Sequence, residues 1–243
     1  MQKTGEQSKM GKTIIQQARG HGSMRYRSTK QAYKITVIYP ELKVSGKGKV
    51  EKLINTICYS APVAKIRLNG KIFYNMAANN TLEGQDFEIG ENASLKEGNI
   101  LPVGKMPLGT LVFNIETYPG SNGKLVRTAG NSAKITKNDK SVTIELPSKQ
   151  EKKFDPRCRA TIGVIAAASR KERPIMKAGK MFYIKGARGA RVWPRTSAVK
   201  MNAVDHPFGC GRGKRIKSKI AKRNAPAGAK VGLLRPRRTG RKK

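Results

Sequence analysis

Residues 64–76 read AKIRLNGKIFYNM and hold the pattern that decides the fold. Every second residue from Ala64 to Leu68 is apolar, and the same period-two alternation resumes after Asn69-Gly70 at residues 72–76. An Asn-Gly pair between two alternating runs favours a type I′ turn, because both central positions of that turn need positive φ. The sequence therefore predicts a β-hairpin at residues 64–76.

The alternation recurs outward from this hairpin in both directions. It predicts a strand at 33–39, strands at 111–115 and 161–165, and a second hairpin formed by 133–137 and 142–146. Gly and Pro separate these runs at short intervals, and no part of this central region keeps a 3.6-residue period over ten positions. Such a pattern is typical of an all-β fold made of small barrels or a sandwich.

Charge divides the chain into a centre and two ends. Residues 1–40 contain a single acid, Glu6, and no acid follows Asp205, whereas the centre holds acids throughout. The pattern predicts a folded body with two polycationic arms that cannot bury enough apolar surface to fold alone. The PGSNG loop at 119–123 suits a boundary between two small barrels. We expect four segments, namely a basic N-terminal arm at 1–32, barrels at 33–118 and 119–200, and a basic C-terminal arm at 201–243.

The net charge indicates the class of partner. The 243 residues carry 51 Lys and Arg against 15 Asp and Glu, which gives a formal net charge of +36. A charge of this size favours a polyanionic partner, and nucleic acid is the first candidate. The longest apolar run, Ile162–Ala168, is far shorter than the roughly 20 residues of a membrane helix. The first residues lack the apolar stretch of a signal peptide, so we expect neither membrane insertion nor secretion.

Residues with catalytic or metal-binding chemistry are few. The three cysteines, Cys58, Cys158 and Cys210, show no paired spacing, so we expect neither a disulfide framework nor a zinc site. The string GCGRGK at 209–214 lacks the spacing of a nucleotide-binding loop and reads better as backbone that can approach a phosphate closely. Asp205-His206 has no nucleophile nearby, so we do not expect a free-standing enzyme.

Two features of the C-terminal third lead to structural expectations. The only tryptophan, Trp193, lies among cations, and we expect its ring to be buried in the second barrel with the flanking arginines on RNA. Ile216 and Ile220 lie four apart among Lys and Arg residues, so a short basic helix could form there.

Longer strings carry a family resemblance. VKMNAVDHPFG at 199–209 closely resembles the signature of the large-subunit ribosomal protein L-two family. Agreement continues in order through most of the chain, at PLGT (107–110), FNIE (113–116), RTAGNSA (127–133), CRATIG (158–163) and RNAPAG (223–228). Phe208 and the NAPAG string look archaeal or eukaryotic, and we favour an archaeal type.

This resemblance implies a fold and a function. The family has an OB-like barrel followed by an SH3-like barrel, with extended arms in rRNA. It implies a structural constituent of the large ribosomal subunit, in the cytoplasm, that is a primary binder of large-subunit rRNA near the peptidyl-transferase region and supports subunit association, tRNA binding and peptide-bond formation. The implied partners are that rRNA, other ribosomal proteins and the small subunit, without membrane contact. No cofactor is implied beyond Mg²⁺ associated with rRNA, and the family histidine matching His206 is a proposed support for peptidyl transfer.

We expect RNA contacts from arginines and lysines, from one asparagine and from one histidine. They are Arg19, Arg25, Arg27, Lys65, Arg67, Arg127, Arg159, Arg188, Arg191, Arg195, Asn202, His206, Arg212, Lys214, Arg215, Arg223, Arg237 and Arg238.

Two other classes of function compete with the ribosomal one. The first is a soluble RNA-modifying or RNA-cleaving enzyme that uses Asp205 and His206. The second is a translation factor or RNA chaperone that binds transiently through its OB-like barrel. The nearly acid-free arms favour the ribosomal hypothesis, because such arms would fold only on permanent insertion into RNA.

The charge also predicts how binding depends on salt. Each phosphate that a cation neutralises releases condensed counterion, so about ten engaged cations would give a slope of several units in a plot of log affinity against log salt. Filter binding of rRNA over a range of KCl concentrations measures this slope. A nearly flat dependence would contradict a role for the charge in binding.

Overall fold

The computed structural model describes residues 14–27, 34–170, 172–187, 192–209, 220–221, 223–225 and 228–234. The chain divides into two compact units. We call residues 29–189 the body, and residues 1–28 together with 190–243 the terminal unit.

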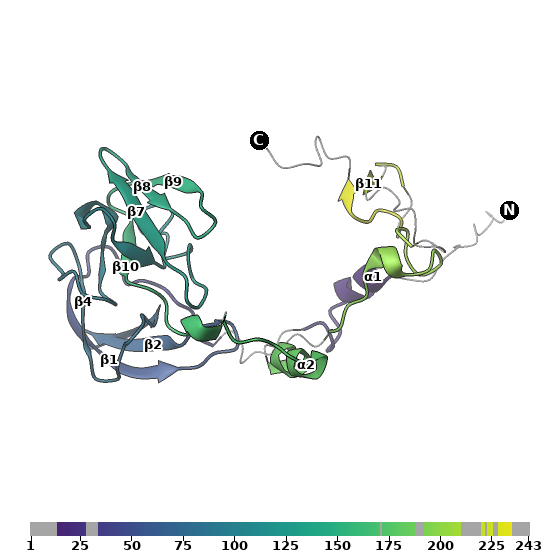
Figure 1. Ribbon diagram of the computed structural model, residues 1–243, viewed down its shortest axis with the longest axis horizontal. Coiled ribbons are helices and arrows are strands. Elements are labelled where there is room, and N and C mark those ends of the chain that lie inside the picture. The colour runs from purple at the N-terminus through teal and green to yellow at the C-terminus, as the bar shows by residue number, and fades with distance from the viewer. Residues whose placement is uncertain are drawn as a thin grey trace, which may run out of the picture. The chain divides into compact units, whose positions relative to one another are not determined.

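A single large sheet dominates the described part of the body. It has ten strands in the order β3-β2-β1-β4-β5-β10-β6-β7-β8-β9 (Figure 1). Neighbouring strands are antiparallel, except that β4 and β5 pair in parallel. This confirms a mostly β protein. The strands are β1 (Gly46–Ile54), β2 (Val63–Leu68), β3 (Lys71–Met76), β4 (Asp86–Ile89), β5 (Ile100–Pro102), β6 (Leu111–Phe113), β7 (Ala133–Asn138), β8 (Val142–Glu145), β9 (Glu151–Phe154) and β10 (Arg159–Ile162).

Both predicted hairpins are confirmed. β2 and β3 pair in register from Val63 opposite Met76 to Leu68 opposite Lys71. Asn69 and Gly70 both have positive φ, at 48° and 76°, as a type I′ turn requires. β7 and β8 form the second hairpin beyond Asn138. Period-two alternation on either side of a short turn was therefore enough to place these four strands.

Two predicted strands differ from the structure. The strand expected at 33–39 is wrong for its described part, in which only Ile38 makes an isolated bridge, to Tyr74. Val37 and Tyr39 are nevertheless buried, so the alternation there reflects burial of an extended segment and not pairing in a ladder. The strand expected at 161–165 begins two residues earlier, as β10.

Strand β1 was not predicted, although it lies inside the sheet between β2 and β4. Its sequence, GKGKVEKLI, is rich in Gly and Lys and has few apolar positions. A Cβ at Gly48 would lie 2.5 Å from the carbonyl oxygen of Arg67 on β2, so close backbone approach requires glycine at this position. The short strands β4, β5 and β9 were also missed.

The structure also contains helices that periodicity did not indicate. α2 (Ala178–Ala187) contradicts the expectation that the central region has no helix. Its apolar residues are consecutive at 181–184 and none of its residues is buried, so no apolar stripe recurs at helical spacing. In the terminal unit, α1 (Ile15–Gly20) is short, and short 3₁₀ turns occur in both units, at Val103–Lys105, Ala168–Arg170 and Ala198–Lys200.

Two expectations for the C-terminal third are also corrected. Trp193 is half-buried and belongs to the terminal unit, so it is not a core residue of the second barrel. Ile220 lies in β11 (Ile220–Ala221), which pairs in parallel with β12 (Leu233–Leu234), and not in a helix. The rest of the expected helix, residues 211–219, lies outside the described residues.

Three hydrophobic clusters fill the described part of the body. One gathers buried side chains between Tyr39 and Ile100, and a second gathers those between Leu101 and Ile162. A third lies among residues from both stretches, including Val63 and Met76 from the first and Phe113 and Ala129 from the second. The two halves of the body therefore have separate cores and a shared one.

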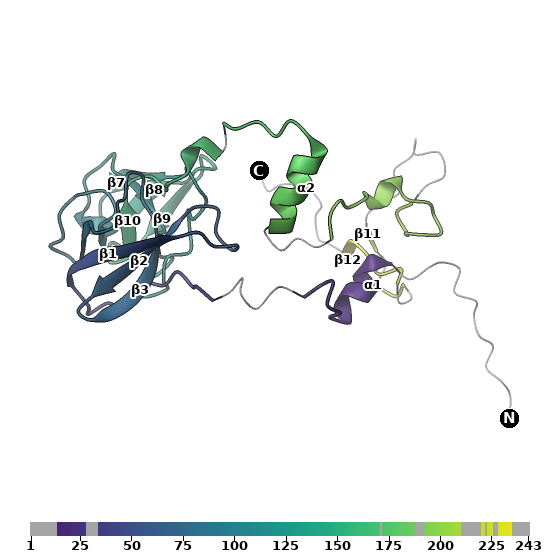
Figure 2. The same cartoon turned by 90° about the horizontal axis from the view of Figure 1, so that it is seen from below.

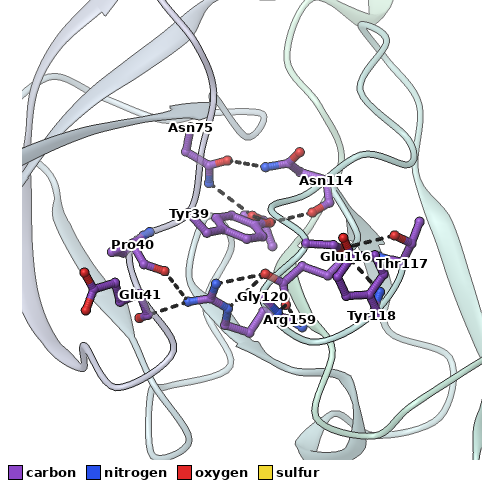
Figure 3. Close-up of polar contacts among 12 residues, drawn as sticks. Tyr39, Pro40, Glu41, Asn75, Asn114, Glu116, Thr117, Tyr118, Gly120 and Arg159 are labelled. Carbon is purple, nitrogen blue, oxygen red and sulfur yellow. Dashed lines mark hydrogen bonds and ion pairs between the residues drawn. The ribbon is translucent and has the colours of Figure 1, made fainter.

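A closed ring of hydrogen bonds joins these halves (Figure 3). The Asn114 amide donates to Asn75 Oδ1 (2.9 Å), and the Asn75 amide donates to Thr161 Oγ1 (3.1 Å). The Tyr39 hydroxyl donates its single proton to the backbone oxygen of Asn114 (2.7 Å), so Thr161 must donate to Tyr39 Oη (2.7 Å). Burial raises the pKa of the Tyr39 hydroxyl above its ordinary value, so the hydroxyl keeps the proton that the ring needs.

A buried ion pair lies beside this ring. Arg159 Nε and Nη2 donate to Glu116 Oε1 (3.3 and 2.8 Å), and Nη1 donates to the carbonyl oxygens of Pro40 and Glu41 (2.7 and 3.3 Å). Glu116 Oε2 accepts from the backbone N–H groups of Arg159 and Gly120 (2.9 and 3.4 Å). Both side chains are almost fully buried, so these bonds compensate two charges removed from water.

The pair predicts a large stability effect. Arg159→Leu leaves the Glu116 carboxylate buried and uncompensated, so the free energy of unfolding should fall by about 3–5 kcal/mol. Urea unfolding of the full-length chain measures this. Arg157→Leu is the matched control, because Arg157 pairs with Asp155 at the surface and should change stability little. Equal effects of the two substitutions would contradict a structural role for the buried pair.

Candidate nucleic-acid interface

The terminal unit concentrates positive charge. Residues 1–28 and 190–243 hold 23 of the 51 Lys and Arg residues but only two of the 15 acids, Glu6 and Asp205. The body holds the other 28 cations with 13 acids. A surface with so few acids can pair few of its cations internally, so most of them remain available to an external polyanion.

The two ends of the chain meet in this unit. Gln17 of α1 accepts a hydrogen bond from the Ile14 N–H (2.9 Å), and a Cβ on Gly228 would lie 3.1 Å from Gln17 Nε2. Ile14 and Ala221, from opposite ends of the sequence, are both buried. Figure 2 shows α1 beside β11 and β12. The described parts of the two arms are thus neighbours in one structure.

Six of the expected RNA contacts are exposed in this unit. They come from both ends of the chain and carry five guanidinium groups and one amide. They are Arg19, Arg25, Arg27, Arg195, Asn202 and Arg223. The structure therefore brings together residues that sequence reasoning assigned to two separate arms and, for Arg195, to the second barrel.

The loop around His206 is compact. The backbone N–H groups of Asp205 and His206 donate to the Asn202 oxygen (3.0 and 3.2 Å), and the N–H of Gly209 donates to the His206 oxygen (2.8 Å). A Cβ at Gly209 would lie 2.2 Å from the Asn202 oxygen, so the loop closes only with glycine there. His206 is 5% exposed and contacts the Phe208 ring, with 5.1 Å between the ring centroids.

The hydrogen bonding of His206 fixes its tautomer. The Phe208 N–H donates to His206 Nδ1 (3.0 Å), so Nδ1 carries no proton in this arrangement. A neutral ring then carries its proton on Nε2. His206 is thus a buried residue that orders its own loop, a role that sequence reasoning, which expected an RNA contact here, did not foresee.

Two expected contacts on β2 share one acid. Glu51 on β1 pairs with Lys65 (2.7 Å, Nζ to Oε2) and with Arg67. Hydrogen bonding to Lys65, which has the larger effect, and to Arg67 lowers the pKa of the Glu51 carboxyl below its usual range. Two cations against one carboxylate leave this patch with a net positive charge that a phosphate could approach.

Two further arginines are engaged within the body. Arg127 donates to Val37 O and Tyr59 Oη (3.4 and 3.0 Å) and stacks on the Tyr59 ring. Arg159 is 5% exposed and all three of its guanidinium nitrogens are bonded internally. Four of its five guanidinium N–H groups donate within the body, so this buried side chain stabilises the fold, and its position does not support the assignment as an RNA contact. The other expected contacts lie outside the described residues, namely Arg188, Arg191, Arg212, Lys214, Arg215, Arg237 and Arg238.

The body also has a groove of about 1020 Å³ between its loops. Cations on its walls are partly neutralised, since Lys47 pairs with Glu88 (3.3 Å) and Arg157 with Asp155 (3.0 Å). Hydrogen bonds from Ser94, together with Lys47, lower the pKa of Glu88 to about 2, so that carboxylate stays charged. The groove is therefore a weaker candidate for RNA than the terminal unit.

The described residues offer few other kinds of site. Within the described segments, no group of three or more His, Cys, Asp or Glu side chains could hold a metal ion. Among the same residues, no helix is long and apolar enough to cross a membrane.

Comparison with known proteins gives consistent matches. Residues 96–228 match the family described as "Ribosomal Proteins L2, C-terminal domain". The Large ribosomal subunit protein uL2 of Methanococcus vannielii is 44% identical over 241 residues, which cover 96% of this chain and all of the relative. The protein of the same name from Methanococcus maripaludis is 43% identical over the same span.

Proposed function

The chain belongs to the uL2 family of large ribosomal subunit proteins, and we propose that it is a primary binder of large-subunit rRNA near the peptidyl-transferase region. It is a structural, non-enzymatic protein of the ribosome. In this role it would also contact other ribosomal proteins and support subunit association and tRNA binding.

One observation carries this proposal. Five exposed arginines and Asn202 from both ends of the chain belong to a single unit that has two acids in all. Phosphate contacts made by such groups fix the position of a protein on RNA without reading its sequence. A permanent structural role therefore suits this unit better than the transient binding of a translation factor.

The proposal includes a division of the body into an OB-like and an SH3-like barrel. The separate hydrophobic clusters, one between Tyr39 and Ile100 and one between Leu101 and Ile162, support two halves. The shared third cluster and the ring of hydrogen bonds would hold those halves in a fixed relation. Two halves held rigidly together would present Lys65 and Arg67 of β2 at a constant angle to RNA.

We also propose that His206 is a positioning residue. Its imidazole is buried and its Nδ1 is occupied by the Phe208 N–H, which leaves Nε2 as its one remaining polar atom. General-base catalysis needs an unprotonated nitrogen within reach of the reacting proton. The observed tautomer offers a donor at Nε2, which suits a hydrogen bond to a phosphate, a 2′-OH or a base edge.

Sedimentation tests the ribosomal role. The tagged full-length chain, expressed in a methanogen or reconstituted with its ribosomal components, should remain with the large subunit through a high-salt gradient. Release at moderate salt would indicate a translation factor. Turnover of naked RNA by the purified protein would indicate an enzyme, and either result would overturn the proposal.

Paired substitutions test the role of His206. His206→Asn keeps an acceptor at the position of Nδ1, whereas His206→Ala leaves the Phe208 N–H without a partner at a cost of about 1–3 kcal/mol. We expect the Ala variant to alter chemical footprints around the loop and to slow peptide-bond formation, and the Asn variant to do so less. Equal loss of the chemical step in both variants, with wild-type footprints, would contradict a positioning role.

A further inference from the structure

Helix α2 exposes large apolar side chains. Tyr183 is 76% exposed and Phe182 is 50% exposed, and Met176, two residues before the helix begins, is 78% exposed. None of the ten residues of α2 is buried. Each of these side chains leaves apolar surface in water, which is unfavourable unless a partner covers it.

Cations surround these side chains. The stretch from Arg170 to Arg188 contains seven Lys and Arg residues and one acid, Glu172. Lys180 lies three residues before Tyr183, and Lys185 lies three residues after Phe182, and residues at this spacing are neighbours on a helix surface. The helix therefore places aromatic rings and positive charge at neighbouring positions along its surface.

This combination favours RNA over a protein partner. Lysine is depleted at protein–protein interfaces, whereas it is enriched where a backbone of phosphates must be followed. Aromatic rings beside cations are the means by which proteins stack on unpaired bases. A protein surface would have to supply both an apolar pocket and several carboxylates at matching positions.

The two rings are suited to separate contacts. The Phe182 and Tyr183 centroids lie 5.8 Å apart, and the ring planes meet at 82°. Two nearly perpendicular rings cannot both lie flat against one base. Each ring therefore offers a face in a different direction, and Tyr183 is the more exposed of the two.

We propose that α2 is an RNA-docking helix, in which Tyr183, with Phe182, stacks on unpaired bases of rRNA while Lys180 and Lys185 bind the adjacent phosphates. This inference rests on the proposed rRNA-binding function and assigns to it a contact that is largely independent of salt. The helix shows no sequence signal for such a role, because its apolar residues follow one another without a helical period.

Titration of the full-length protein with purified large-subunit rRNA at several KCl concentrations separates stacking from charge. Tyr183→Ala combined with Phe182→Ala should lower affinity about 5- to 100-fold at every salt concentration and leave the salt slope unchanged. Lys180→Gln combined with Lys185→Gln should reduce that slope by about two units. Tyr183→Trp, in an otherwise wild-type chain, should retain affinity because it keeps a stacking face.

The matched control is Tyr118→Ala. Tyr118 is 61% exposed and has Lys124 5.8 Å from its ring centre, so it resembles Tyr183 in exposure and in its cation. We expect this control to bind rRNA as the wild type does. Because no residue of α2 is buried, the α2 variants should also unfold in urea at the wild-type midpoint.

Three outcomes would overturn the inference. Wild-type affinity in the aromatic variant would show that α2 does not stack on rRNA, while the proposed function would stand. If the aromatic variant kept its affinity for rRNA but the subunits assembled with it lacked another ribosomal protein, α2 would dock on protein. Failure of the wild-type chain itself to bind rRNA would instead overturn the proposed function.

Discussion

The buried charge of Glu116 is the constraint on which the body depends. A carboxylate with no exposure is tolerated only if every oxygen finds a donor, and the donors here come from Arg159 and Gly120. Arg159 and Thr161 are two residues apart on β10, so the strand directs both side chains to one face, and Asn114 and Glu116 follow directly after the end of β6. One pair of segments thereby forms both the ion pair and half of the hydrogen-bonded ring (Figure 3). The segment at 39–41 completes both, through Tyr39 and the carbonyl oxygens of Pro40 and Glu41.

The acids available in each unit determine what its arginines can do. In the body, acids and carbonyl oxygens engage Arg67, Arg127, Arg157 and Arg159 in ion pairs and internal hydrogen bonds. In the terminal unit the acids are nearly absent, and the described arginines are exposed. The same residue type therefore stabilises the fold in one unit and is available to a polyanion in the other. Local acid content separates the two roles, which residue type alone does not.

Local turn chemistry explains why some features could be predicted from the sequence. Asn69-Gly70 specifies its own φ angles, so the hairpin of β2 and β3 needed no knowledge of the rest of the chain. β1 could not be predicted, because Gly48 is required by the backbone of Arg67 on a neighbouring strand. The burial of Arg159 likewise depends on Glu116, 43 residues away. α2 was missed because its exposed side chains carry no periodicity that burial would impose. The family resemblance was right, since long strings are compared directly and do not require a contact to be inferred.

The charge of the terminal unit links its structure to its partner. Its 23 cations far outnumber its two acids and repel one another, and this repulsion opposes the burial of Ile14, Ala221 and His206. Phosphates remove the repulsion and add charge-assisted hydrogen bonds, so binding and folding of this unit should stabilise each other. The body has 28 cations against 13 acids and its own polar network, and it needs this support less. In the proposed rRNA-bound state, RNA would thus contribute to the stability of the terminal unit's fold, whereas the body is stabilised by contacts within the chain.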